Sequence, residues 1–288
     1  MRFFIVDAFT REPFGGNPAG VVLIDGDFPD DEWMRQVAAE LRYSETAFVR
    51  QDGPKEFTVR YFTPAGEVDL CGHATIAAFG VLRREGVVNE GDTCVNHTLA
   101  GRLEVEIGEQ VMMQMAQPHV LDQTVDTGRL HSIMTGTSAA GWPELPVDIV
   151  STGLPDIIMP VADVAALNSL RPDMDALTAL SREMGVVGVH AFAFADDAFT
   201  AHVRNFAPLY DIPEESATGT ANAALTHYLQ RYGIITAPAS CRFLQGESMG
   251  RPSIVKSVLD VDGNIRVGGD SVIVARGELV LEGVAKLI

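Results

Sequence analysis

The chain has few cysteines and no long apolar run. Its three cysteines, Cys71, Cys94 and Cys241, lie far apart in 288 residues, and an odd number at such spacings gives no disulfide framework. No apolar stretch approaches the roughly 18 residues of a membrane-spanning helix, and the N-terminus lacks the pattern of a secretory signal peptide. We therefore expect a cytoplasmic protein with reduced thiols and no membrane partner.

Positive charge is also scarce. Lys and Arg number 21 against 39 Asp and Glu, which gives a formal net charge of −18. Nucleic acids and anionic membrane surfaces attract basic patches, so this balance argues against both as partners. Seven histidines are present, but none forms an H-x-x-x-H pair or accompanies a C-x-x-C pair. The sequence therefore predicts no metal site.

A diverged internal repeat is the main organising feature of the chain. Residues 57–86 and 199–233 each contain a β-rich run, a glycine-containing turn and a helix of small residues that ends at glycine. Gly72 matches Gly219 at the two helix starts. One repeat of this length indicates two similar domains rather than a solenoid. We predict an α+β fold of two pseudo-symmetric domains, each a curved sheet around one central helix.

The order of apolar and turn-forming segments sets the expected boundaries. We predict an N-terminal domain over residues 1–118 and a C-terminal domain over residues 119–277, with a last strand near 278–288 returning to the first domain. Helical spacing predicts a helix over 72–84. Residues 99–115 alternate apolar and polar side chains, as the strands of a hairpin do.

The two predicted helix starts carry candidate binding residues. The motifs C-G-H (71–73) and T-G-T (218–220) place glycine where backbone N–H groups approach a ligand, at the positive end of the following helix. Ordinary helix capping explains most such sequences. Their occurrence at matching positions of both copies instead favours a pseudo-symmetric site in a cleft between the domains, which would hold a small carboxylate.

Chemically informative differences between the two copies are few. The first copy has Glu45 where the second has Val189, Cys71 where the second has Thr218, and His73 where the second has Thr220. Glu45, at a strand entrance, is a candidate general base if it is desolvated, although a lone loop glutamate is more often solvated. Cys71 would be an acidified thiol at a helix N-terminus. Racemisation by two thiols is disfavoured because the second copy has Thr218, a poor base.

Four longer motifs occur in order along the chain. They are V-D-A-F-T…P-F-G-G-N-P-A-G-V-V (6–22), S-E-T-A-F (44–48), F-T-P-A-G-E-V-D-L-C-G-H-A-T (62–75) and E-E-S-A-T-G-T-A (214–221). Together they resemble the PhzF-like phenazine-biosynthesis isomerase family. The resemblance implies the diaminopimelate-epimerase-like fold, with a barrel-like sheet around a central helix in each domain and the active site between the domains. It also implies a homodimer.

The resemblance further implies which residues form the site. The implied catalytic residues are Glu45, His73 and Glu215. The substrate-binding candidates are Cys71, Gly72, Thr218, Gly219 and Thr220. Glu215 and Ser216 stand where the family usually has Asp and Pro, and Thr220 replaces the usual Ser, so we expect this loop to hold a different substrate.

These features predict a cofactor-independent isomerase that moves a proton on a small carboxylate resembling an amino or hydroxy acid, with Glu45 as the acid/base group. A single base returns the proton to the same face, which favours a suprafacial hydrogen shift or double-bond migration over inversion. Two alternatives stay open. One is a Cys71-dependent epimerase, racemase or dehydratase, and the other is a non-catalytic homologue that binds a metabolite or a protein partner.

Overall fold

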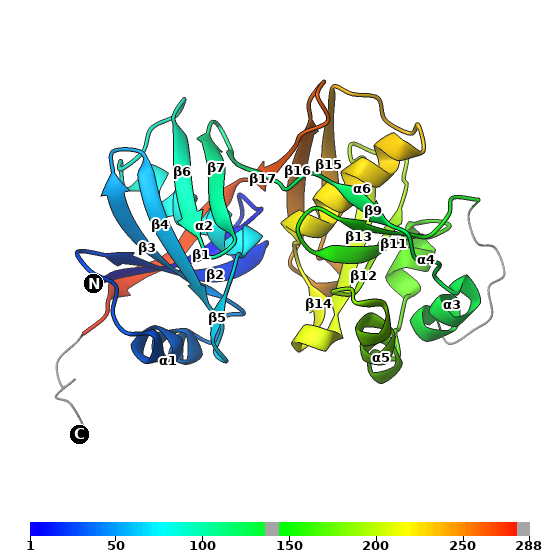
Figure 1. Ribbon diagram of the computed structural model, residues 1–288, viewed down its shortest axis with the longest axis horizontal. Coiled ribbons are helices and arrows are strands. Elements are labelled where there is room, and N and C mark those ends of the chain that lie inside the picture. The colour runs from blue at the N-terminus through cyan, green and yellow to red at the C-terminus, as the bar shows by residue number, and fades with distance from the viewer. Residues whose placement is uncertain (136–143, 281–288) are drawn as a thin grey trace. The chain divides into compact units, whose positions relative to one another are not determined.

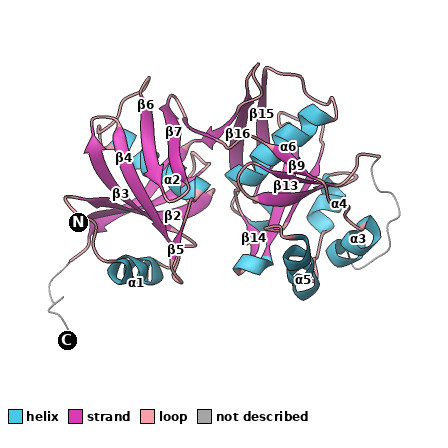
Figure 2. Cartoon of the chain, viewed as in Figure 1, coloured by secondary structure: helices cyan, strands magenta, loops and turns pink. Residues whose placement is uncertain are grey.

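The computed structural model describes residues 1–135 and 144–280. Contacts within the chain divide it into two compact units, each with a curved sheet and a central helix (Figure 1). Of the described residues, the first unit comprises 1–14, 18–111 and 270–280, and the second comprises 15–17 and 112–269. Each unit contains both helices and strands (Figure 2).

The first unit is a mixed sheet around one helix. Its strands are β1 (Arg2–Ala8), β2 (Asn17–Ile24), β3 (Thr46–Gly53), β4 (Glu56–Phe62), β5 (Glu67–Val68), β6 (Thr93–Thr98), β7 (Gly101–Ile107) and β18 (Ser271–Glu278), and its helices are α1 (Asp31–Leu41) and α2 (Gly72–Arg84). Pairing runs β18–β1–β2–β3–β4–β6–β7, with β2–β3 and β4–β6 parallel. Helix α2 contacts β1, β3, β7 and β18, so the sheet wraps around it.

The second unit has the same plan. Its strands are β8 (Val111–Gln114), β9 (His119–Leu121), β10 (Asp148–Ser151), β11 (Pro155–Pro160), β12 (Val189–Ala193), β13 (Ala201–Ala207), β14 (Ile212–Glu215), β15 (Ala239–Gln245), β16 (Ser253–Leu259) and β17 (Ile265–Gly269), and its helices are α3 (Thr127–Thr135), α4 (Val164–Ser169), α5 (Met174–Met184) and α6 (Gly219–Arg231). The parallel pairs are β11–β12 and β13–β15, and α6 contacts β10, β11, β16 and β17. None of the helices in the described ranges has the length and apolarity needed to cross a membrane.

The two central helices, α2 and α6, have the same length and end in the same way. Both have 13 residues, and Gly86 and Gly233 follow them in the left-handed conformation, with φ of 73° and 70°. Only glycine adopts that conformation without a steric cost, so these residues end the helices. Together with the matching parallel strand pairs, this confirms the predicted α+β fold of two pseudo-symmetric copies.

Small side chains allow each central helix to lie close to its own sheet. Nine residues are buried in each helix, among them several alanines. An aromatic pair anchors each helix: Phe79 packs edge-on against Phe57, and Tyr228 against Phe192, with ring centroids 5.5 Å apart in both cases. Such a pair contributes about 0.5–1.5 kcal/mol beyond the burial of its area. The middle and later turns of each helix are therefore held firmly against its own sheet.

Strand pairing shifts the alignment of the two copies by one residue at Glu45. Before β3, Gly20 N donates to Glu45 O at 3.3 Å, and before β12, Ile157 N donates to Gly188 O at 3.0 Å. Gly188, and not Val189, is therefore the structural counterpart of Glu45. The apolar runs align well in either register, and only the hydrogen-bond ladder distinguishes the two.

The structure adds to the sequence pattern in several further places. Within residues 99–115, β7 forms a hairpin with the preceding strand β6, and β8 also pairs with β17 of the second unit. The division into units consequently falls after Val111, whereas the sequence places it at 118. The strand that returns to the first unit is β18, which pairs with β1, and most of the predicted strand at 278–288 lies outside the described residues. Strand β9 and helix α3 lie in a stretch without a clear pattern.

Candidate functional site

Glu45, Cys71 and His73 form a cluster in the first unit. Glu45 immediately precedes β3, while Cys71 and His73 flank the first residue of α2. His73 Nε2 lies 3.3 Å from Glu45 Oε2, and Cys71 Sγ lies 3.4 Å from His73 Nδ1. The structure thus brings together a carboxylate, an imidazole and a thiol that the sequence singled out from two separate segments.

A buried hydrogen-bond network fixes the start of α2. Thr75 Oγ1 donates to Cys71 O at 2.7 Å, and the Tyr61 hydroxyl on β4 lies 2.6 Å from Thr75 Oγ1. Asn96 on β6 donates to the same hydroxyl at 3.0 Å. Burial raises the pKa of Tyr61, so its hydroxyl stays protonated and can donate to Thr75. Two strands therefore hold the backbone at Cys71 in place.

Burial determines what Glu45 can do. Its side chain is 14% exposed and that of His73 is 4% exposed. Within the described part of the chain, no group donates a hydrogen bond to Glu45 Oε2, although His73 Nε2 lies 3.3 Å away. A buried carboxylate oxygen without an aligned donor is available to accept a proton from a ligand.

Glu215 is the centre of a second cluster, which lies in the second unit. Asn17, which belongs to this unit, donates through Nδ2 to Glu215 Oε1 at 2.9 Å, and Thr218 Oγ1 donates to Glu215 Oε2 at 2.5 Å. Both carboxylate oxygens therefore accept hydrogen bonds, and the side chain has a fixed orientation. This arrangement suits a group that orients a ligand. A role in proton transfer stays a prediction.

Two amide side chains hold the start of α6. Gln245, the last residue of β15, accepts a hydrogen bond from Thr218 N at 3.1 Å and donates to Glu215 O at 2.8 Å. Asn222 Nδ2 donates to Gln245 Oε1 at 2.9 Å. Sequence reasoning missed Asn17, Asn222 and Gln245, because their contacts join segments far apart in the chain. The available signal for Asn222 and Gln245 was a polar residue beside apolar ones, whereas Asn17 lies in the turn P-F-G-G-N-P (13–18).

Asp156 on β11 is a further carboxyl group that sequence reasoning missed. It is 1% exposed. Burial raises the pKa of Asp156 to about 8, and the negative charge of Glu215 adds to this effect. The group is therefore mostly protonated at neutral pH and can donate a hydrogen bond. Its signal in the sequence is an aspartate inside the apolar run L-P-D-I-I-M-P (154–160).

Gly72, Gly219 and Thr220 lie in the first turns of α2 and α6. The residues before these helices, Cys71 and Thr218, make no side-chain capping hydrogen bond, and neither first turn contains Asp or Glu. The first N–H groups of a helix have no partner inside the helix, so each start offers donors to an anion. Substrate binding by these residues stays a prediction.

Comparison with known proteins identifies the family. The family model for phenazine biosynthesis-like (PhzC-PhzF) proteins matches residues 6–277. The chain belongs to the PhzF family. An uncharacterised isomerase of Deinococcus radiodurans is 36% identical over 295 residues, covering 96% of this chain and 94% of the relative. The trans-2,3-dihydro-3-hydroxyanthranilate isomerase of Pseudomonas aeruginosa is 29% identical over 291 residues, with coverage of 97% and 99%.

A solved structure supports the assignment to the PhzF family. The crystal structure of the Bacillus anthracis PhzF-family protein matches with a TM-score of 0.87 at 26% identity, covering 98% of this chain and 99% of that one. The predicted family and fold class are confirmed. The relatives are named isomerases, and the prediction that this PhzF-family chain is an isomerase is confirmed at that level.

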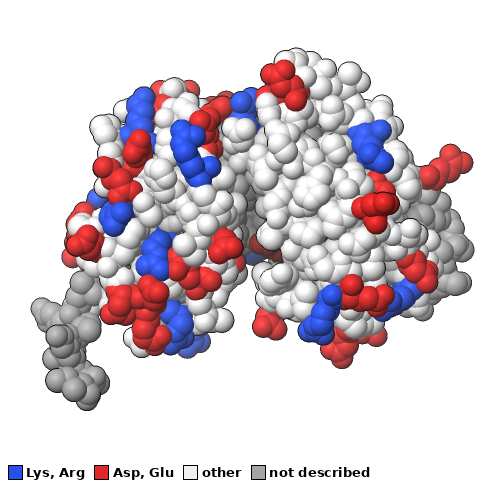
Figure 3. All heavy atoms as spheres, in the orientation of Figure 1, with Lys and Arg blue, Asp and Glu red and all other residues white. Residues whose placement is uncertain are grey.

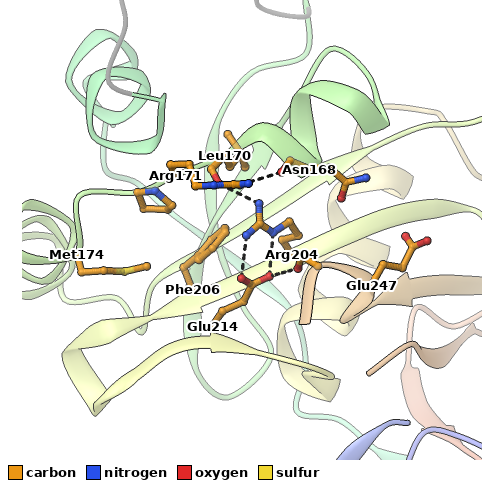
Figure 4. Close-up of a pocket in the computed structure, with 10 residues that line it drawn as sticks. Asn168, Leu170, Arg171, Met174, Arg204, Phe206, Glu214 and Glu247 are labelled. Atoms are coloured by element: carbon orange, nitrogen blue, oxygen red, sulfur yellow. Dashed lines mark hydrogen bonds and ion pairs between the residues drawn. The ribbon is translucent and has the colours of Figure 1, made fainter. Parts of the chain in front are cut away.

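This PhzF-family protein also has a cavity of about 460 Å³ in its second unit (Figure 4). The cavity is lined by Asn168, Leu170, Arg171, Pro172, Met174, Arg204, Phe206, Glu214, Glu247 and Ser248, none of which is a predicted site residue. Arg204 binds both oxygens of Glu214 at 2.8 Å and donates to the carbonyls of Leu167 and Leu170. This ion pair anchors β14, and the next residue along the strand is Glu215. The Arg204–Glu214 ion pair on the cavity wall therefore helps to hold Glu215 of the second cluster in place.

Proposed function

We propose that the protein catalyses proton transfer on a small carboxylate, with Glu45 acting as general base and then as general acid. The observation that supports this is the buried Glu45 Oε2, which lies 3.3 Å from His73 Nε2 and has no aligned hydrogen-bond donor among the described residues. Such an oxygen can approach a substrate C–H group without first giving up a strong hydrogen bond.

The reaction needs one proton and no oxidant. Glu45 removes a proton from an acidified carbon of the substrate, and the electrons of the broken C–H bond spread into the adjacent unsaturated system. The same carboxyl group then returns the proton to a neighbouring carbon on the same face. His73 orients Glu45 or relays the proton. Helix N–H groups stabilise the negative charge that develops during transfer.

The second cluster is assigned to substrate binding. The Pseudomonas aeruginosa relative is named for trans-2,3-dihydro-3-hydroxyanthranilate, a carboxylate that carries amino and hydroxyl groups. A ligand of this class has a carboxylate for the N–H groups at Gly219 and Thr220, and an amine or hydroxyl for Glu215. Since Glu215 is one methylene longer than the usual Asp, we expect that polar group to sit at a different position on this protein's substrate.

Cys71 supports a second candidate function. Its Sγ lies 3.4 Å from His73 Nδ1, close enough for the imidazole to accept the thiol proton. The thiolate would then remove the substrate proton in an epimerase, racemase or dehydratase. A binding homologue without activity is the third candidate, and it would show stabilisation by a ligand without turnover.

Matched variants distinguish these candidates. With trans-2,3-dihydro-3-hydroxyanthranilate and related acids as substrates, we expect Glu45→Gln to lower kcat/KM by about 10²–10⁴-fold or more, with an unchanged melting temperature. Glu40→Gln, an exposed glutamate on α1, is the control and should behave as wild type. Turnover by Glu45→Gln at the wild-type rate would rule out the glutamate mechanism. Loss of turnover in Cys71→Ala alone would establish the thiol mechanism.

A further inference from the structure

The first cluster holds one donor atom each of sulfur, nitrogen and oxygen. The ligand atoms of Glu45, Cys71 and His73 all lie within 4.8 Å of one another. Cys71 is 8% exposed, and the other two side chains are 14% and 4% exposed. No other group of three such side chains lies this close among residues 1–135 and 144–280. Thiolate, imidazole and carboxylate are the three ligand types that zinc uses in proteins.

The distances in the cluster place the three ligand atoms near the spacing of a tetrahedral zinc site, although only one pair already has it. With zinc bonds of about 2.0–2.3 Å, two tetrahedral ligands lie roughly 3.3–3.4 Å apart for a nitrogen–oxygen pair and roughly 3.5–3.6 Å apart for a nitrogen–sulfur pair. His73 Nε2 lies 3.3 Å from Glu45 Oε2 and 3.9 Å from Cys71 Sγ. The nitrogen–oxygen distance therefore already suits two ligands of one zinc ion, whereas Cys71 Sγ, which lies nearer to Nδ1 at 3.4 Å, has to turn toward Nε2 to become the third ligand.

Charge also fits a divalent ion. A carboxylate and a thiolate carry two negative charges, which zinc neutralises, and burial disfavours any net charge in this place. The second copy lacks the site, since its counterparts are Gly188, Thr218 and Thr220. The sequence predicted no metal because the ligands come from two segments with no familiar spacing.

We propose that Glu45, Cys71 and His73 bind a zinc ion with three protein ligands and an open fourth position. Binding requires the Cys71 thiolate, so it releases a proton and weakens as the pH falls. Zinc would occupy the Glu45 oxygen that the proposed function needs, and would therefore inhibit proton transfer. The site makes the protein sensitive to zinc without making zinc part of its reaction.

Cobalt and zinc binding to the full chain test this site without using activity as the readout. Metal-free protein is titrated with Co²⁺ and the near-ultraviolet thiolate-to-cobalt band is followed, and Zn²⁺ affinity is measured by calorimetry. We expect one zinc per chain. Cys71→Ser should lose the cobalt band and bind zinc at least about tenfold more weakly, and His73→Ala should also bind more weakly.

The other two cysteines are the matched controls. Cys94 and Cys241 are buried, and burial raises the pKa of both, to about 11 for Cys94, so Cys94→Ser and Cys241→Ser should bind as wild type. Melting temperatures of the metal-free variants report on folding. A cobalt band that persists in Cys71→Ser would overturn the proposal. Equal zinc affinity in wild type and all three serine variants would also overturn it. Either result would leave the role of Glu45 to be decided by its own kinetics.

Discussion

At the scale of the residue, the proposed function rests on side chains that one copy has and the other lacks. Glu45 stands before β3, and its structural counterpart before β12 is Gly188, which has no side chain. Sequence comparison identified Glu45, Cys71 and His73 because polar groups replace apolar or weakly polar ones there. It missed Asp156, whose counterpart is not obvious from the sequence and whose chemistry depends on burial. Burial is a property of the folded chain.

Asp156 should make stability depend on pH. Its pKa in the folded state, about 8, lies above the unfolded value of about 3.9, so the folded state binds more protons between these values. Its contribution to stability is complete below about pH 4 and is lost as the pH rises toward 8. The free energy of unfolding should fall by at most about 1.4 kcal/mol per pH unit from this group.

The variant Asp156→Asn removes this dependence, because the amide does not titrate. Denaturant unfolding of both proteins at about pH 5 and about pH 7.5 should show the variant gaining stability relative to wild type as the pH rises. His190, whose pKa burial lowers to about 4, acts at the acidic end in both proteins and cancels in the comparison. If the free energy of unfolding changed equally with pH in wild type and Asp156→Asn, Asp156 would be ionised in the folded state.

At the scale of the element, the fold of each copy was largely readable from the sequence. The helix predicted over 72–84 is present as α2, because small and apolar residues, a glycine at the start and a glycine after the end all agree. Strand register was not readable, since β12 and the first half of β3 are buried on both faces and their side chains fit either alignment. The place of β8 in the second unit depends on its long-range pairing with β17, which no local pattern encodes.

Gly188 offers a test of the corrected register. A Cβ at this position would lie 1.8 Å from Phe206 O and 2.8 Å from Phe206 C, so a side chain would push against the backbone of β13. We expect Gly188→Ala to destabilise the protein by about 1–3 kcal/mol or more.

The control for Gly188→Ala is a glycine with free space around it. Gly66→Ala, where a Cβ would meet nothing within 4 Å, should change stability little. Chemical denaturation of both variants measures the difference. Equal stability of the two would mean that β13 does not approach Gly188 as closely as the structure has it.

At the scale of the whole molecule, excess negative charge is the dominant physical property. The net charge is −18, and on the face in Figure 3 the Lys and Arg atoms are interspersed with carboxylates rather than gathered into a basic patch. Like charges on one compact chain repel, which destabilises the folded state. Exposed ion pairs offset little of this.

Salt should therefore stabilise the protein. Raising the ionic strength from about 0.01 M to about 0.15 M shortens the screening length from about 30 Å to about 8 Å, which weakens the repulsion. We expect the melting temperature to rise with sodium chloride over this range in a thermal unfolding series. A falling melting temperature would show that attractive ion pairs outweigh the net charge.

The most direct test of the account is deuterium incorporation in D₂O. Wild type, Glu45→Gln and Cys71→Ala, each freed of metal by a chelator, are incubated with a panel of small amino, hydroxy and unsaturated carboxylic acids, and label is read by mass spectrometry. We expect label with wild type and Cys71→Ala and none with Glu45→Gln. Label appearing with Glu45→Gln at the wild-type rate would contradict the assignment of Glu45 as the base.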